Sequence, residues 1–460
     1  MVPLICIKTT EIFLFSRNIA LSLRKWLVAP KRKPLVLLGA RQVGKTHALN
    51  ELSKHIKGQL HVFDFEETRS LHKLFAEDID PKTLIKGLEF ASGRAIDPKI
   101  DLVIFDEIQA CPRALTSLKY FSENLPELSL ASAGSLLGLT LPEDSFPVGK
   151  VDLMYMWPLT FEEFLGAIND ERGSIALKEW NSRSEIPLSE IVHEHLWRQL
   201  KSYFVVGGMP AAINAYIQHT PQTLTAFESA RAVQEQLITM YTADMAKHSG
   251  RVSAMHIGRI WTQLPQQLAS TADSSAPKYQ FSGVLPTARG YRSLAGAIDW
   301  LENAGLIIKA PIANQGSHPL AHFTKDNVFK LFCFDVGILG ALSKLHPSAV
   351  LQYEYGTFKG YVAENFVAQE LLSHGVKPVS WSEATAQVEF VMESHGNIIP
   401  IEVKSGWVTQ AKSLKVFISK YGTKNAVILS ANPQRIKTAK SGPARYLPLY
   451  IAGKLREIFP

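Results

Sequence analysis

The sequence predicts an α/β protein built around an open parallel sheet, and three observations lead to that class. Over the first 165 residues, short apolar runs that fit buried strands alternate with segments of helical pattern. One run, residues 35–38, leads directly into a loop bordered by glycines, and another, residues 102–105, ends in two carboxylates. Ligands of parallel sheets bind beyond the carboxyl ends of the strands, so both features are expected at one edge.

The loop after the first run reads GARQVGKT and fits the phosphate-loop pattern G-x-x-x-x-G-K-[ST] in full. Its glycines let backbone N–H groups turn toward phosphate oxygens. Lys45 is expected at the β- and γ-phosphates and the Thr46 hydroxyl on Mg²⁺, while residues 46–52 begin a helix whose N-terminus favours an anion. The expected nucleotide-binding residues are Gly39, Ala40, Arg41, Gln42, Val43, Gly44, Lys45 and Thr46. The alternative is a chance glycine-rich turn.

The second half of the site comes at the end of the other run. Asp106 is expected to hold Mg²⁺ together with Thr46, and Glu107 to orient or deprotonate the attacking water. Ser135 follows a further strand at residues 128–133 and is a candidate sensor of the γ-phosphate, with a simple turn residue as the alternative. Together the two halves predict an Mg²⁺-dependent nucleoside triphosphatase.

Composition narrows the class of protein. The 460 residues, of which 46% are hydrophobic and 20% charged, predict a soluble protein of several domains. Cys6, Cys111 and Cys333 are isolated, which opposes a disulfide framework or a cysteine zinc site and favours the cytoplasm. Lys8 and Glu11 interrupt the apolar start, so no signal peptide is expected. No apolar run is long enough to span a bilayer, and no membrane partner is expected.

The net charge of +7 is concentrated at the two ends of the chain. Residues 1–34 carry seven Lys/Arg and one Glu, and residues 411–460 carry ten Lys/Arg and one Glu, which leaves the middle at −8. Concentrated positive charge is typical of proteins that bind a polyanion, and DNA is the expected partner. A solubilising surface is the alternative.

Changes of pattern along the chain divide it into four units. The ATPase core is expected at residues 17–165. Residues 166–250 are mostly helical, with a Gly-Gly-Met-Pro break at 207–210, and are expected to form a helical lid. Residues 251–315 show helix, helix and strand, the pattern of a winged helix-turn-helix that binds DNA or docks a protein. Residues 316–460 form a last α/β unit.

A second candidate site lies in the last unit. Glu389 and Glu402 fall on two strands joined by a turn at residues 395–397, Lys404 shares a face with Glu402, and Glu364 lies on the preceding helix. Two carboxylates can hold Mg²⁺ that activates water, and a lysine can position the nucleophile, which is the chemistry of a nuclease. A salt-bridged sheet surface is the alternative, because E-x-K occurs by chance on amphipathic strands.

Along nearly its whole length the sequence resembles the prokaryotic AAA+-type P-loop ATPases that carry a C-terminal domain of unknown function with a restriction-endonuclease-like, PD-(D/E)XK fold. The resemblance implies ATP and Mg²⁺ as cofactors, the roles given above for Asp106, Glu107 and Ser135, a winged helix in the middle and a nuclease-like fold at the end. The matching stretches are PLVLLGARQVGKT, LVIFDEIQACPRAL, SLKYFSENLPEL, AGSLLG, FPVGKVDLMYMWPLTFEEFL, VGGMPAAI, LENAGLI, LFCFDVGIL, GYVAENFVAQELL and IPIEVKSG.

Two positions depart from the family pattern. Lys150 stands where the family has an arginine, so a catalytic contact to the γ-phosphate would keep the charge and lose the planar fork. Glu389 stands where the family usually has an aspartate, and its longer side chain changes the geometry offered to a metal. The resemblance therefore implies slower ATP turnover and weakened cleavage.

The resulting interpretation is a cytoplasmic ATPase that binds DNA, in which ATP closes the lid and hydrolysis reopens it. The first alternative is an ATP-driven regulatory switch that binds a protein partner and has a degenerate nuclease-like domain. The second is a homo-oligomeric ring that remodels other proteins. Salt-steep DNA binding separates the interpretation from the first alternative, and the oligomeric state tests the second.

Overall fold

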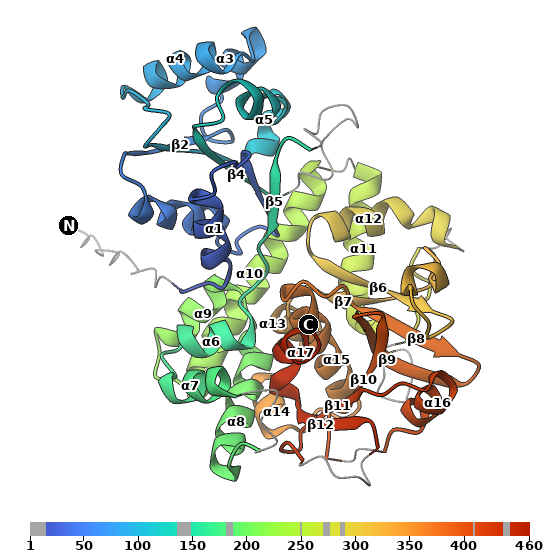
Figure 1. The fold of residues 1–460 in the computed structure, drawn as a ribbon. Helices are drawn as coiled ribbons and strands as arrows, with labels where there is room; N and C mark the ends of the chain where they lie inside the picture. Colours follow the sequence, from blue (N-terminus) through green and yellow to red (C-terminus); the bar gives the residue numbers. More distant parts are fainter. Residues whose placement is uncertain are drawn as a thin grey trace, which may run out of the picture.

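The computed structural model describes residues 15–135, 149–180, 187–248, 251–269, 277–285, 290–407, 410–435 and 442–460. Two sheets organise these residues: a five-stranded sheet in the N-terminal part and a seven-stranded sheet in the C-terminal part. A long helix, α10 (Leu224–His248), runs from the first sheet to the helices beside the second (Figure 1).

The first sheet is entirely parallel and has the order β2-β3-β4-β1-β5. Its strands are β1 (Leu35–Leu38), β2 (Leu60–Asp64), β3 (Leu102–Asp106), β4 (Ser129–Gly134) and β5 (Asp152–Tyr155). β1, β3 and β4 confirm the strands expected at residues 35–38, 102–105 and 128–133, whereas β5 alternates in exposure at the sheet edge and was not predicted. Because β4 lies between β1 and β3, the phosphate loop and the paired acids flank its carboxyl end.

Helices cover both faces of this sheet, which explains why its central strands are almost entirely buried. One core cluster joins α3, α4 and α5 to Val36 and Phe105, and another joins α1 and α2 to Leu35 and Leu37. The helices are α1 (Ile19–Leu27), α2 (Lys45–Asn50), α3 (Leu71–Glu77), α4 (Pro81–Ser92) and α5 (Pro112–Asn124).

The middle of the chain is helical, as predicted. It consists of α6 (Phe161–Ala167), α7 (Glu171–Glu179), α8 (Glu190–Val206), α9 (Pro210–Ile217) and α10. The expected break falls between α8 and α9, where Gly207 has a φ of 69°. Thr160 and Glu163 form the capping box expected at the start of α6.

These helices contact the C-terminal part through buried polar groups, and the lid expected at residues 166–250 stays a prediction. The backbone N–H of Gly208 donates to Asp335 Oδ2 at 2.6 Å, and Gln369 Nε2 donates to the Tyr203 hydroxyl at 2.7 Å. Asp335 and Gln369 belong to the C-terminal part, and all of these groups are buried. One continuous apolar core joins the helices to the C-terminal part and to strands of the first sheet.

The second sheet is mixed and has the order β12-β11-β10-β9-β8-β6-β7. Its strands are β6 (Ile307–Ala313), β7 (Phe329–Cys333), β8 (Val379–Glu383), β9 (Ala386–Ser394), β10 (Asn397–Val403), β11 (Ala426–Ser430) and β12 (Ala444–Pro448). β9 and β10 form the predicted hairpin, with positive φ at His395 and Gly396. β6 and β7 pair across the expected boundary at residue 316, so the strands of the last two predicted units share one sheet.

Helices also cover the second sheet on both faces. α15 joins the large core that includes the middle helices, and α16 packs on the opposite face. The helices of this part are α11 (Arg251–Leu268), α12 (Ala295–Asn303), α13 (Val336–Leu342), α14 (Pro347–Gln352), α15 (Phe358–Ser373), α16 (Lys412–Tyr421) and α17 (Leu455–Ile458). α11, α12 and β6 follow the helix, helix, strand order predicted for this segment.

Candidate active site

The backbone of the phosphate loop requires glycine at both conserved positions of the motif. Gly39 has a φ of 151° and Gly44 a φ of 98°. A Cβ atom at Gly39 would lie 2.2 Å from the carbonyl oxygen of Met156, closer than any real contact. The loop is thus fixed between β1 and the chain that continues β5, and it ends where α2 begins.

Lys45 is buried and makes its contacts with the loop itself. Its Nζ donates to the carbonyl oxygens of Gly39 at 3.0 Å and Ala40 at 2.8 Å. Burial lowers the pKa of Lys45 to about 8, and Glu107 and Asp106 oppose that shift. The ammonium group is thus charged at neutral pH, and no carboxylate of the described chain forms an ion pair with it.

Asp106 and Glu107 lie at the end of β3, next to the loop. Asp106 is 6% exposed, and its Oδ1 accepts a hydrogen bond from the Glu107 N–H at 3.0 Å. Both carboxylates act on the charge of Lys45, which places them near the phosphate loop as predicted. The Thr46 hydroxyl and the Asp106 carboxylate are oxygen donors of the kind Mg²⁺ prefers, so the residues fit that ion. Gln109, which donates to Glu107 Oε2, was missed in the sequence.

Arg41 connects the loop to three other parts of the chain. Its Nε donates to Ser135 Oγ at 3.2 Å, which places Ser135 beside the loop as predicted. Its guanidinium group pairs with Asp244 of α10 and lies 3.7 Å from Glu66. The Tyr241 hydroxyl donates to the Arg41 carbonyl at 3.0 Å. Asp244 and Tyr241 were missed because they lie about 200 residues away in the sequence.

The turn after α12 also reaches the loop. A Cβ atom at Gly305 would lie 3.2 Å from the Ala40 backbone nitrogen, and Gly305 has a φ of 71°. The glycine of the LENAGLI stretch therefore permits both the end of α12 and a close approach to the phosphate loop. The loop is bounded by the parallel sheet, by α10 and by this turn.

Lys150 is not brought to this site. Its Nζ pairs with Glu123 Oε1 on α5 at 2.9 Å, and both side chains are more than one-third exposed. Lys150 precedes β5, whose first residue, Asp152, pairs with Leu35 at the start of β1. The phosphate loop follows the opposite end of β1. The described residues therefore place Lys150 away from the phosphate loop, and its catalytic contact stays a prediction.

A second polar network starts behind the loop. Arg17 donates to the Val43 carbonyl at 2.9 Å and pairs with Glu163 Oε1 at 3.2 Å. Its guanidinium group also donates to the Trp157 carbonyl at 2.5 Å. These contacts join the segment before α1, the loop and the start of α6.

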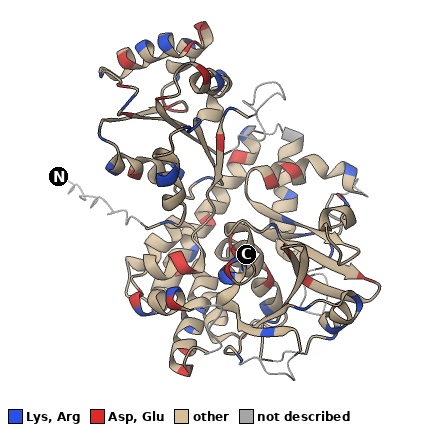
Figure 2. Cartoon of the chain, viewed as in Figure 1, with Lys and Arg blue, Asp and Glu red and all other residues tan. Residues whose placement is uncertain are grey.

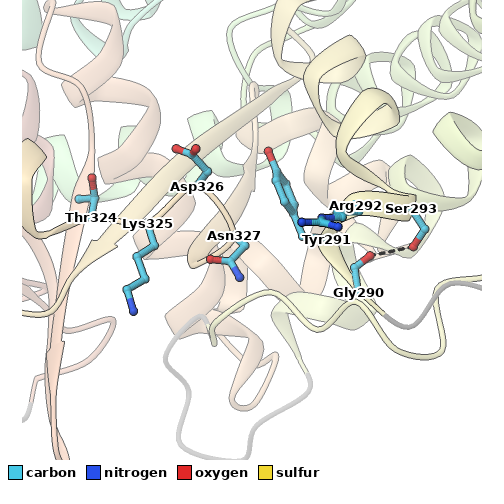
Figure 3. A pocket seen from close by; sticks show the side chains of 8 residues that line it. All are labelled: Gly290, Tyr291, Arg292, Ser293, Thr324, Lys325, Asp326 and Asn327. Atoms are coloured by element: carbon cyan, nitrogen blue, oxygen red, sulfur yellow. Dashed lines mark hydrogen bonds between the residues drawn. The ribbon is translucent and has the colours of Figure 1, made fainter.

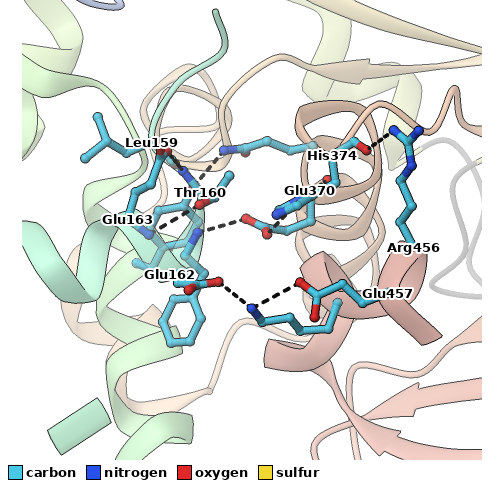
Figure 4. A network of polar contacts seen from close by, with 12 residues as sticks. Leu159, Thr160, Glu162, Glu163, Glu370, His374, Arg456 and Glu457 are labelled. Carbon is cyan, nitrogen blue, oxygen red and sulfur yellow. Dashed lines mark hydrogen bonds and ion pairs between the residues drawn. The ribbon is translucent and has the colours of Figure 1, made fainter. Parts of the chain in front are cut away.

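The network continues into the C-terminal part through Glu370 of α15 (Figure 4). Glu370 Oε1 accepts a hydrogen bond from the backbone N–H of Phe161 at 2.9 Å, at the N-terminus of α6. Burial raises the pKa of Glu370 to about 7, and His374 opposes that shift. Lys454 pairs with Glu162 at 2.8 Å in the same network. The first turn of α6 is thus capped partly by a residue 209 positions later in the sequence.

The residues of the second candidate site do come together. Lys404 Nζ lies 2.7 Å from Glu402 Oε1 and 4.0 Å from Glu389 Oε1. Glu364 pairs at 3.4 Å with Lys330 of β7, which the sequence had not indicated. Burial and the charge of Glu402 raise the pKa of Glu389 to about 8. We call these five residues the glutamate–lysine cluster.

Lysines pair with carboxylates of the glutamate–lysine cluster. No group of three or more His, Cys, Asp or Glu residues within the described ranges is arranged to hold a metal ion. Glu402 Oε2 is buried without a hydrogen-bond partner in the described structure. The other carboxylate contacts described for the cluster are made with Lys330, Lys404 and the backbone N–H of Val403. Two lysine ammonium groups thus lie beside these carboxylates, and metal binding by Glu364, Glu389 and Glu402 stays a prediction.

Comparison with protein families matches three segments. Residues 31–165 match a family described as an AAA domain, and these residues hold the phosphate loop and the paired acids. Residues 198–349 match a domain of unknown function, DUF8612, and residues 359–450 match another, DUF4143. No curated protein matches the chain. The N-terminal part therefore contains an AAA-type P-loop nucleotide-binding domain.

Comparison with solved structures gives only distant likenesses. The Orc1 protein of Aeropyrum pernix in complex with DNA is 16% identical over 75% of this chain and 97% of its own, with a TM-score of 0.27. The Drosophila ORC bound to DNA is 12% identical over 74% of this chain and 89% of its own, at 0.28. PCH-2 of C. elegans is 11% identical over 50% and 64%, at 0.27. TM-scores this low add no support to the assignment of residues 31–165 as an AAA domain.

Within the described ranges, none of the helices combines the length and apolar character needed to cross a bilayer.

Proposed function

We propose that this protein is an Mg²⁺-dependent ATPase. The observation that carries the proposal is the phosphate loop with its buried, charged Lys45 beside Asp106 and Glu107. A match to an AAA domain over residues 31–165 supports it. ATP is then the substrate, and the reaction is attack of water on the γ-phosphate.

The residues divide the chemistry among them. Lys45 exchanges the carbonyls of Gly39 and Ala40 for phosphate oxygens, since an ammonium bound only to carbonyls gains from a full negative charge. Thr46 and Asp106 would hold Mg²⁺, which neutralises charge on the phosphates when bound. Glu107 accepts a proton from the attacking water, and Ser135, whose hydroxyl accepts a hydrogen bond from Arg41, is the sensor of the γ-phosphate.

Phosphate release by the purified chain tests this proposal. Lys45→Ala is expected to lose both nucleotide binding and hydrolysis, and Glu107→Gln to bind ATP while losing hydrolysis by at least about 100-fold. Lys86→Ala, which changes an exposed lysine on α4, is the matched control and should hydrolyse ATP normally. Equal hydrolysis by all four proteins would contradict the proposal.

DNA is the proposed partner of the ATPase, on the strength of the net charge of +7. Figure 2 shows that basic and acidic positions are interspersed over most elements, so local sites matter more than one basic face. An open pocket of about 830 Å³ lies between η3 (Tyr291–Ser293) and the loop before β7 (Figure 3). Arg292 and Lys325 on its two sides, with Asn327 between, offer donors for backbone phosphates.

The salt dependence of DNA binding tests this partner. A double variant, Arg292→Ala with Lys325→Ala, is expected to bind duplex DNA more weakly and to reduce the slope of log K against log salt by about 1–2, because two phosphate contacts are lost. Lys86→Ala should leave the slope unchanged. Binding without a salt slope in the unaltered chain would favour the protein-partner alternative.

The four predicted units, at residues 17–165, 166–250, 251–315 and 316–460, enter the proposal as an ATPase core, a helical unit, a winged helix and a nuclease-like unit. The paired charges of the glutamate–lysine cluster favour the alternative in which the last unit binds without cutting. Incubation with plasmid DNA and Mg²⁺ or Mn²⁺ tests this. We expect no cleavage; cleavage that Lys404→Ala removes would show an active nuclease.

A further inference from the structure

The backbone at Glu107 is unusual. Glu107 has φ 46° and ψ 43°, the left-handed region that a glutamate rarely adopts. This conformation ends β3 abruptly and starts the short helix η2 (Ile108–Ala110). Ile108 enters the core on one face of the sheet, while the Glu107 side chain stays partly exposed. Such strain persists only where surrounding contacts hold it.

Gln109 supplies one of those contacts. Its side chain is 8% exposed, and its Nε2 donates to Glu107 Oε2 in a short hydrogen bond. The other end of the amide, Oε1, is buried and has no hydrogen-bond partner in the described chain. A buried amide with an unsatisfied oxygen is destabilising, and an apolar side chain of similar volume would pack at this position without that cost. Packing alone therefore does not account for Gln109.

We propose that Gln109 is a positioning residue for Glu107 in ATP hydrolysis, an inference that rests on the proposed function. The amide holds one carboxylate oxygen, so the rotation of the glutamate side chain is restricted and its other oxygen stays available for the attacking water. Gln109 does not touch the substrate and acts only through Glu107. Restricting a reacting group to its productive orientation raises the rate of the chemical step rather than the affinity for substrate.

Steady-state kinetics of Gln109→Leu test the proposal. We expect kcat to fall about tenfold, with KM and the affinity for a fluorescent ADP analogue unchanged within about twofold. In a Glu107→Gln background, Gln109→Leu should have no further effect on kcat, because no carboxylate remains to be positioned. Gln59→Leu, at an exposed glutamine in the same domain, is the matched control and should match the unaltered chain.

Gln109→Glu provides a second variant of the same shape, in case Gln109→Leu does not fold. It replaces the donor with an acceptor, and kcat should fall further than in Gln109→Leu because two carboxylates repel. The role of Gln109 would be overturned, without affecting the proposed ATPase function, by an unchanged kcat in either folded variant. The same would follow if Gln109→Leu lowered kcat by the same factor in the Glu107→Gln background as in the unaltered chain. An unaltered chain without ATPase activity, or an active Glu107→Gln variant, would instead overturn the proposed function and this role with it.

Discussion

Lys45 of the phosphate loop and Lys330 of the glutamate–lysine cluster are both buried lysines, but their partners differ. Lys330 Nζ lies 3.4 Å from a buried carboxylate, that of Glu364. Lys45 Nζ lies 2.8–3.0 Å from two backbone carbonyls and has no ion pair among the described residues. A buried charge that forms an ion pair is neutralised within the folded chain. A buried ammonium group that contacts only carbonyl dipoles is still stabilised by binding an anion.

This difference separates a site that requires a ligand from one that maintains the fold. The set of charged residue types is similar in the two clusters, since each combines glutamates or aspartates with lysine. Only the distances between the charged groups show that the lysines of the glutamate–lysine cluster form ion pairs, whereas Lys45 contacts carbonyl oxygens. Substitutions that remove equivalent charges should therefore have opposite consequences for stability and for activity.

The largest expected effect is on folding stability. Lys330→Met leaves Glu364 buried without its ion pair and should lower the free energy of unfolding by about 3–5 kcal/mol. Lys45→Met, the matched variant, should change it by about 1 kcal/mol or less while ATP hydrolysis is lost. Chemical denaturation followed by circular dichroism measures both. Equal destabilisation by the two variants would remove the distinction between the clusters.

A smaller effect is expected in the pH dependence of stability. The pKa of Glu389 is raised in the folded chain, so the folded state binds a proton more tightly than the unfolded state. The contribution of Glu389 to the free energy of unfolding is fully present below its ordinary pKa of about 4.5, and it is lost as the pH rises toward 8. Glu389→Gln should reduce this loss by on the order of 2 kcal/mol, because glutamine does not ionise. Denaturation at pH 5 and pH 8.5 measures it, and an unchanged pH dependence would contradict it.

The smallest effect is expected at the contact between the loop and α10. Asp244→Asn weakens the pair with Arg41, whose side chain is 21% exposed, so stability should change by less than about 1 kcal/mol. Arg41 then becomes available to phosphate, and ATP should bind about threefold more tightly. Titration with a fluorescent ATP analogue measures this. Glu235→Gln, an exposed acid on the same helix, controls for net charge, and equal gains in both variants would assign the change to charge alone.

The sequence was most informative where a function depends on neighbouring residues. β1 with its loop and β3 with its acids are local patterns, and a parallel sheet brings their ends together. Gln109 is only two residues from Glu107, but its hydrogen bond depends on the left-handed backbone of Glu107, which no local pattern indicates.

Contacts between distant segments could not be predicted in this way. Arg41 was expected to bind nucleotide, but its pair with Asp244 joins residues 203 positions apart. Lys330 lies in an apolar run that does not indicate a charged partner, and its side chain pairs with Glu364, 34 residues later. The middle helices looked separable because their helical pattern ends near residue 250, although their apolar faces pack against the C-terminal part.

The cap that Glu370 provides to α6 also has a consequence for the order of folding during synthesis. The backbone N–H of Phe161 cannot form its hydrogen bond until Glu370 has been translated, 209 residues later. At typical rates of about 5–20 residues per second, that interval is roughly 10–40 s. During this time the apolar faces of α6 and α8 lack the C-terminal surface that later covers them. The nascent chain therefore exposes a hydrophobic surface of the kind that chaperones bind.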